Sequence, residues 1–263
     1  RSLMTSGQLQ RLIDADNLRG MTSNPSIFQK AIGGTAEYDD DLQALIEQDP
    51  DADATDLYEQ IAIADIQRAC DIMRPVFDET GSDGLVSLEV SPHLARDTDG
   101  TIEEARRLWA AVDRPNLMIK VPGTPQGLNA VEALLVDGIN VNITLLFGLD
   151  AYEQTVQTYL RALEQRQRDG KSLSTVASVA SFFLSRIDTA VDRELRQRID
   201  PQVDARIVTE AEALLGRTAV ASAQLAYARF VELSASARWQ RLAAAGARPQ
   251  RLVWASTGTK DPS

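Results

Sequence analysis

The chain has 263 residues, of which 44% are hydrophobic and 25% are charged, a composition typical of globular proteins. Its 27 basic and 38 acidic residues give a net charge of −11, which argues against a nucleic-acid or anionic-membrane partner. Cys70 and His93 are the single cysteine and histidine, which excludes a disulfide within this sequence and any paired-histidine metal site. No apolar run reaches the roughly 20 residues of a membrane span, and we expect a cytoplasmic protein.

Six short apolar runs recur along the chain and predict six β-strands. Each run is rich in apolar or β-branched residues, and most are bounded by Gly, Pro, Asn or Ser. The runs are Leu18–Ser23, Gly84–Val90, Asn116–Val121, Ile139–Thr144, Val176–Phe182 and Arg251–Ser256.

Amphipathic helical patterns lie between these runs. One begins at Thr101 with a sequence close to a capping box, and the last is alanine-rich and is expected to break into two helices. The acidic residues between positions 40 and 53 are expected to form solvated helix ends and a loop. The predicted helices are Thr55–Glu79, Thr101–Val112, Pro125–Val136, Ala151–Arg168 and Arg217–Ala245.

Strands that alternate with helices pair in parallel through right-handed crossovers. Two folds fit this alternation, a doubly wound sheet and a closed barrel. No glycine-rich fingerprint follows the first run, which weighs against a dinucleotide-binding sheet. Polar residues stand at the carboxyl ends of the predicted strands, where a barrel gathers its active site. The sequence therefore predicts an α/β protein with a single (β/α)8 TIM-barrel domain over residues 1–263.

Lysine is rare in this chain, and one lysine interrupts an apolar strand. Of the 27 basic residues only four are lysines, and Lys120 lies inside a buried-strand pattern two residues before the Pro122-Gly123 pair. Burial disfavours the charged ammonium form, which would leave a nucleophilic amine. The structural alternative is a lysine that snorkels at a strand end or pairs with an acid.

Glu89 places a carboxylate at the end of another apolar strand. Charged side chains are rarely buried without a partner. Glu89 could therefore neutralise Lys120, or it could move protons through a water molecule as a general acid and base. These two roles are compatible.

Further polar side chains stand at strand ends. Asn140, Asn142 and Thr144 alternate along one run, so they share one face of the strand. Asn24 and Ser181 end two other strands. Each alone is commonly a turn or capping residue, but together in one barrel mouth they predict a pocket for a polyhydroxylated substrate.

Six segments, in order from Gly20 to Lys260, resemble the transaldolase family, specifically its bacterial branch with longer chains. The segments are Gly-Met-Thr-Ser-Asn-Pro-Ser from Gly20, Ser-Leu-Glu-Val from Ser87, Met-Ile-Lys-Val-Pro from Met118, Gly-Ile-Asn-Val-Asn-Ile-Thr-Leu-Leu-Phe from Gly138, Val-Ala-Ser-Phe-Phe-Leu-Ser-Arg from Val179 and Trp-Ala-Ser-Thr-Gly-Thr-Lys from Trp254.

The resemblance implies a barrel of the class I aldolase type, which works through a lysine Schiff base without a metal or an organic cofactor. It implies transfer of a dihydroxyacetone unit from sedoheptulose 7-phosphate or fructose 6-phosphate to glyceraldehyde 3-phosphate or erythrose 4-phosphate, in the pentose phosphate pathway. The residues carried over are Lys120 for the imine, Glu89 and Thr144 for the proton-shuttling water, Asn24, Asn142 and Ser181 for the donor hydroxyls, and Arg186 and Ser256 for the phosphate.

The sequence departs from the family pattern in two places. The family carries an acid/base aspartate on its first strand, which Asp14 and Asp16 do not match, so we expect the native chain to be longer and the first and last barrel strands to lie outside this sequence. Gly258 stands where many transaldolases carry a phosphate-binding arginine. Lys260 is the available substitute, and we expect it to join Arg186 and Ser256.

Two other functions remain open on the sequence. The same lysine could serve a Schiff-base aldolase that cleaves or forms fructose 6-phosphate without an acceptor. A barrel that binds sugar phosphates without turnover is the alternative from a different functional class, since a fold does not establish an activity.

Overall fold

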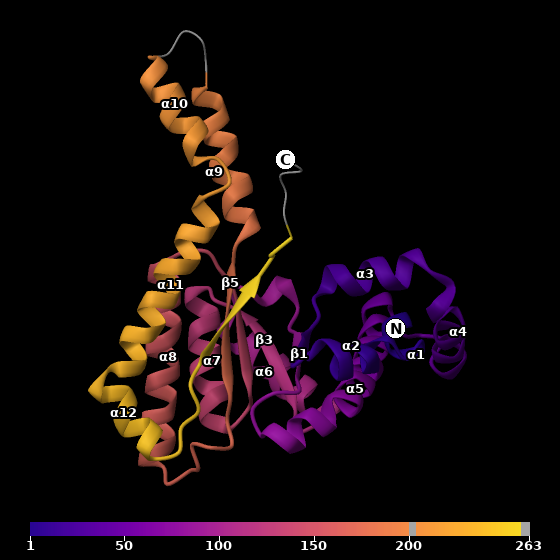
Figure 1. Cartoon of the computed structure of the whole chain (residues 1–263). Coiled ribbons are helices and arrows are strands. Elements are labelled where there is room, and N and C mark those ends of the chain that lie inside the picture. The colour runs from indigo at the N-terminus through magenta and orange to yellow at the C-terminus, as the bar shows by residue number, and fades with distance from the viewer. Residues whose placement is uncertain (200–203, 259–263) are drawn as a thin grey trace. The chain divides into compact units, whose positions relative to one another are not determined.

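The computed structural model describes residues 1–199 and 204–258. Within them six strands form one sheet in the order β1-β2-β3-β4-β5-β6, and helices separate successive strands along the chain (Figure 1). The strands are β1 (Gly20–Thr22), β2 (Leu85–Glu89), β3 (Leu117–Pro122), β4 (Val141–Leu146), β5 (Ser178–Phe183) and β6 (Arg251–Ala255). All six predicted strands are thus confirmed, with ends that shift by a few residues.

The sheet topology decides between the two predicted folds. Strand β1 pairs in parallel with β2, β2 with β3, and β5 with β6. In a doubly wound sheet the strand order reverses at a switch point, whereas in a (β/α)8 barrel it follows the chain. The observed order follows the chain, which confirms the predicted barrel class.

Two compact units divide the chain. The first comprises Arg1–Val121 and Ile139–Val141, and the second comprises Pro122–Gly138 and Asn142–Ser263. The single domain expected over residues 1–263 stays a prediction. Each unit is described by itself below.

In the first unit the long helix α5 packs on β2 and on α6. Asp53 begins α5 with a capping box that it shares with Asp56, and Gly81 ends the helix in the left-handed conformation with φ of 66°. The helices of this unit are α1 (Ser2–Thr5), α2 (Gln8–Asp16), α3 (Pro25–Gly34), η1 (Ala36–Tyr38), α4 (Asp39–Gln48), α5 (Ala54–Thr80), η2 (Pro92–Leu94) and α6 (Thr98–Val112).

The capping box predicted at Thr101 is wrong. Helix α6 begins three residues earlier, because the side chain of Asp97 accepts a hydrogen bond from the backbone N–H of Gly100 and caps the helix there. The Thr101 hydroxyl instead donates back to the carbonyls of Leu94 and Asp97. An aspartate upstream therefore took the capping role, and Thr101 became a buried residue of the first turns.

In the second unit α7 packs on α8, and α8 also contacts α11 and α12 (Figure 1). The predicted break in the alanine-rich segment is confirmed at Ser236, which ends α11 and caps α12 through a hydrogen bond from the N–H of Trp239 to Oγ. The sequence patterns do not predict α9 and α10. Helix α9 is mostly polar, whereas α10 carries apolar residues of which Ile207 and Leu214 are exposed. The helices are α7 (Pro125–Asp137), α8 (Leu149–Arg168), α9 (Ser185–Arg198), α10 (Ala205–Leu214), α11 (Thr218–Ala235) and α12 (Ala237–Ala244).

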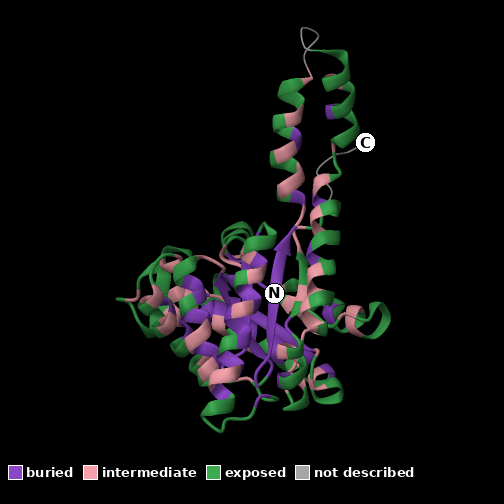
Figure 2. Cartoon of the chain, turned by 90° about the vertical axis from the view of Figure 1, so that its left-hand side faces the viewer, coloured by how far each residue is buried: buried purple, intermediate pink, exposed green. Residues whose placement is uncertain are grey.

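The strands carry the buried residues that position the site. Strands β3 and β5 are buried along their whole length, whereas the residues of β1 and β6 are exposed or intermediate. Figure 2 shows buried residues on strands and on the sides of the helices next to them. Because β3 is fully buried, any polar side chain on it must find its partners inside the protein. Among the described residues, every helix is too short or too polar to span a lipid bilayer.

Candidate active site

Lys120 and Glu89 form the centre of the site in the first unit. The two residues are partners in the parallel register of β2 and β3. The Nζ atom of Lys120 donates to Oε2 of Glu89 at 2.7 Å and to the backbone oxygen of Ser23 at 3.3 Å. The side chains are only 8% and 13% exposed, so each charge is compensated chiefly by the other. The predicted pairing of these two residues is therefore seen in the structure.

The end of β1 completes the surroundings of the Lys120 amine. The hydroxyl of Ser23 donates to the carbonyl of Ser87 at 2.8 Å, which fixes the Ser23 backbone beside β2 and orients its own carbonyl. Sequence reasoning missed Ser23 in this role, because the contact is made by a backbone atom that any residue could supply.

Tyr58, on α5, was also missed by sequence reasoning. Burial raises the pKa of Tyr58, and the negative charges of Glu89 and Glu104 raise it further. A neutral phenol therefore lies within the electrostatic reach of the Glu89 carboxylate at physiological pH. No local sequence pattern connects Tyr58 with Glu89, because the two meet only through the packing of α5 on β2.

Asn24 follows β1 and has a structural task of its own. Its Oδ1 accepts a hydrogen bond from the backbone N–H of Ile27 at 2.9 Å and caps α3. The capping oxygen is thereby committed, while the side-chain amide donates to no partner in the part of the chain that the structure describes. Asn140 is structural as well, because its amide donates to the carbonyl of Leu117 at 2.9 Å and ties the start of β4 to β3.

In the second unit, Asn142 and Ser181 are brought together. The hydroxyl of Ser181 donates to Oδ1 of Asn142 at 2.7 Å, and both residues are buried. Thr144 is fully buried, and its hydroxyl has no hydrogen-bond partner among the described residues. Buried polar atoms are normally satisfied; among the described residues Oδ1 of Asn116 and Oε1 of Gln250 are unpaired as well.

Arg186 and Ser256 meet through an intermediate residue. Ser185 begins α9, its hydroxyl lies 2.9 Å from that of Ser256, and its N–H donates to the Ser256 carbonyl at 2.8 Å. Arg186 is the next residue of the helix and is exposed to solvent. The end of β6 is thus attached directly to the helix turn that carries the arginine. Lys260, the third residue predicted for the phosphate, lies outside the described residues.

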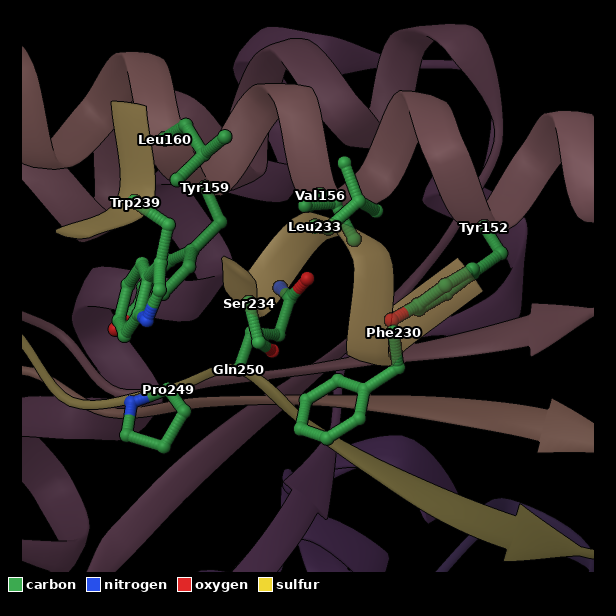
Figure 3. Close-up of a pocket in the computed structure, with 10 residues that line it drawn as sticks. All are labelled: Tyr152, Val156, Tyr159, Leu160, Phe230, Leu233, Ser234, Trp239, Pro249 and Gln250. Carbon is green, nitrogen blue, oxygen red and sulfur yellow. The ribbon is translucent and has the colours of Figure 1, made fainter. Parts of the chain in front are cut away.

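A small cavity in the second unit is separate from these residues. It lies among α8, α11, α12 and the segment before β6, and Tyr159, Trp239 and Gln250 are among the residues that line it (Figure 3). Its volume is about 20 Å³, which is room for one water molecule and far too little for a sugar. None of the predicted site residues lines this cavity.

Neither the cysteine nor the histidine adds chemistry to the site. Burial raises the pKa of the Cys70 thiol to about 12, so the group is an unreactive thiol at neutral pH. His93 lies in η2, the turn-like segment that follows β2. Across residues 1–199 and 204–258, no group of three or more His, Cys, Asp or Glu side chains is arranged to hold a metal ion.

Comparisons with known proteins identify the family of the chain. Residues 4–263 match the family model described as "Transaldolase/Fructose-6-phosphate aldolase". The chain is 50% identical to a protein of Thermobifida fusca, 48% identical to one of Thiobacillus denitrificans and 46% identical to one of Trichodesmium erythraeum, each named "Transaldolase". These matches cover 100% of this chain and 69% to 70% of the relatives.

Proposed function

The chain belongs to the transaldolase/fructose-6-phosphate aldolase family, and we propose that it is a transaldolase that transfers a dihydroxyacetone unit between sugar phosphates through an imine on Lys120. The names of its relatives support a transaldolase, which is a transferase. The observation that carries the proposed chemistry is the buried pair of Lys120 and Glu89, whose charged atoms lie 2.7 Å apart.

The first chemical task is to free the lysine of its proton. As an ion pair, Lys120 holds an ammonium group that cannot attack a carbonyl, and Glu89 is the carboxylate in position to accept the proton. The neutral amine then attacks the ketone carbon of the donor sugar, and loss of water gives the imine. Glu89 would serve again as acid and base in that dehydration, through a water molecule positioned with the help of Thr144.

The carbon–carbon bond is broken next. The protonated imine withdraws electrons from the bond beyond the neighbouring carbon. As that bond breaks, the hydroxyl of the leaving part passes its proton through the water molecule to Glu89 and becomes the aldehyde of the departing aldose phosphate. The three-carbon unit remains on Lys120 as an enamine. The enamine then adds to the aldehyde of a second aldose phosphate, and water releases the product. Asn24, Asn142 and Ser181 are proposed to hold the donor hydroxyls, and Arg186, Ser256 and Lys260 the phosphate.

Trapping of the imine tests this proposal. The protein is incubated with fructose 6-phosphate and borohydride and then digested, and the peptides are weighed by mass spectrometry. We expect the added mass on the peptide that contains Lys120, whereas Lys30 and Lys171, which are exposed, serve as internal controls. Lys120→Arg should lose both the label and turnover, because a guanidinium stays protonated. A label on either control lysine would assign the imine elsewhere.

The family description includes both a transferase and an aldolase, so the products must separate the two reactions. A transaldolase needs an acceptor aldose phosphate, whereas an aldolase releases free dihydroxyacetone without one. The names of the relatives favour the transferase. Release of dihydroxyacetone at the same rate with and without erythrose 4-phosphate would favour the aldolase, and tight binding without trapping would favour a binding protein.

A further inference from the structure

Arg186 is an exposed cation whose contacts are unusual. In the part of the chain that the structure describes it forms no ion pair, and its guanidinium carbon lies 5.1 Å from the centre of the Phe183 ring. A guanidinium that stacks on a ring keeps all of its N–H donors available at its edge, whereas a salt bridge would occupy them. The contact therefore restrains Arg186 without consuming its binding capacity.

A second ring supports the first. Phe147 follows β4 and its ring centre lies 5.1 Å from that of Phe183, with the two planes inclined by 42°. Phe183, at the end of β5, is 8% exposed, whereas Phe147 is 42% exposed. An exposed phenylalanine ring contributes less hydrophobic free energy to folding than a buried one, so the exposure of Phe147 has a cost in stability. Both rings belong to the second unit, as does Arg186.

The backbone on both sides of this cluster is held in place. Leu145, two residues before Phe147, has φ of 63°, a conformation that is costly for a branched side chain and that persists where the surrounding structure imposes it. At the start of α9, the hydrogen bonds between Ser185 and Ser256 fix the first turn of the helix. Arg186 lies in this turn.

We propose that Phe183 and Phe147 form a platform that positions the Arg186 guanidinium for the phosphate of the sugar substrate, and that this platform sets the preference for phosphorylated over unphosphorylated sugars. The inference rests on the proposed function for the identity of the ligand. Phe183 and Phe147 are positioning residues, since they act through Arg186. A guanidinium that is already held in one orientation loses less conformational entropy on binding than a mobile one does. It can then bind two phosphate oxygens at once at a lower cost in free energy.

The chain provides a matched control in the neighbouring residue. Phe182 is fully buried, and its ring packs edge-to-face on Trp254 at 6.2 Å, with no cation in contact. Phe183→Leu and Phe147→Leu keep an apolar side chain but remove the ring that faces the cluster. Phe182→Leu makes the same change one position away from it, so it reports the effect of a lost ring on the fold alone.

Two measurements on the full chain separate the platform from the chemistry. Calorimetric titration with inorganic phosphate reports the anion site without any reaction at Lys120. Borohydride trapping compares fructose 6-phosphate with unphosphorylated dihydroxyacetone as the source of the imine. We expect Phe183→Leu to weaken phosphate binding about two- to five-fold, the loss of one cation–ring contact. Phe147→Leu removes only the ring that supports Phe183, so we expect a weaker loss in the same direction. Both variants should raise the half-saturating concentration of fructose 6-phosphate but not of dihydroxyacetone.

The double variant completes the test. Phe183→Leu should add nothing to the loss caused by Arg186→Ala, because the platform acts only through that arginine. The inference is overturned if Phe183→Leu binds phosphate as the wild type does, if Phe182→Leu weakens it equally, or if the Phe183→Leu effect persists without Arg186. If phosphate binding responds as expected but no imine forms on Lys120, the platform is supported and the proposed reaction is rejected. If the imine forms on Lys120 but phosphate binding does not change in Phe183→Leu, the proposed reaction is supported and the platform is rejected.

Discussion

Lys120 and Glu89 are separated by 31 positions in the chain but are register partners on neighbouring strands, and their charged atoms lie 2.7 Å apart. Because both side chains are almost fully buried, neither charge can turn to water if the other is removed. The contact that holds the Lys120 amine beside a carboxylate therefore also matters for the stability of the first unit.

The pair makes a prediction about stability. We expect Glu89→Leu and Lys120→Met each to lower the free energy of unfolding by about 3 kcal/mol, because each leaves a buried charge without its partner. The double variant should be more stable than either single variant. Urea unfolding measures all three, and Asp78→Asn is the control, because it removes the exposed pair with Arg74 and should cost under about 1 kcal/mol. Additive losses in the double variant would contradict this account.

A second prediction concerns alkaline pH. Burial raises the pKa of Cys70 from 9.0 to about 12, so above pH 9 the unfolded chain loses a proton that the folded chain retains. Stability from this group is complete below pH 9 and falls as the pH rises toward 12, by about 1.4 kcal/mol per pH unit. Between pH 8 and pH 10 the wild type should lose about 1 kcal/mol more than Cys70→Ala. The free energy of unfolding of both proteins is measured by urea unfolding at each pH. If the wild type and Cys70→Ala lose the same free energy of unfolding, the thiol has the same pKa in the folded and the unfolded chain, and the prediction is wrong.

Tyr152 provides an internal check on that measurement. Burial raises the pKa of its phenol from 10.0 to about 12, so its contribution to stability begins to fall only above pH 10. Tyr152→Phe should therefore follow the wild type between pH 8 and pH 9.5 and separate from it only at higher pH.

A third prediction concerns Arg166, a buried arginine on α8 whose partners are backbone carbonyls and a hydroxyl. It donates to Leu135 and Val136 at the end of α7, to the carbonyl of Ser172, and to the Thr175 hydroxyl. Arg166→Met should lower the free energy of unfolding by about 3 kcal/mol, because several buried acceptors lose a charged donor together. Arg168→Met, two positions away and exposed, is the control and should change it by less than about 0.5 kcal/mol.

A fourth prediction reverses the usual preference for alanine over glycine. At Leu145, where φ is 63°, Leu145→Gly should be more stable than Leu145→Ala by about 1 kcal/mol, because glycine adopts this conformation without strain. At the next residue, which is buried and has no positive φ, Leu146→Ala should be more stable than Leu146→Gly. Thermal unfolding of the four variants gives both comparisons, and the same order at both positions would refute the strain at Leu145.

Much of the local structure could be predicted because it depends on near neighbours in the sequence. Hydrophobic runs predicted all six described strands, and the break at Ser236 followed from the length and composition of one helical segment. The start of α6 was misplaced because several residues near Thr101 are able to cap a helix, and only the folded backbone selects Asp97. Helix α9 was missed because it is mostly polar. Helix α10 does carry apolar residues at helical spacing, and it was missed in spite of them; the structure leaves Ile207 and Leu214 exposed.

The site divides in the same way. The residue types and their places at strand ends marked Lys120, Glu89, Asn142 and Ser181 from the sequence alone. Their partners came only from the tertiary structure: the carbonyl of Ser23 on the lysine, the ring of Phe183 under Arg186, and the helix-capping bond that occupies Asn24. The spacing of hydrophobic residues and the residue types themselves can be read from a short segment of the sequence. Register, stacking and burial depend instead on which distant segments pack together, and a single sequence does not record those contacts.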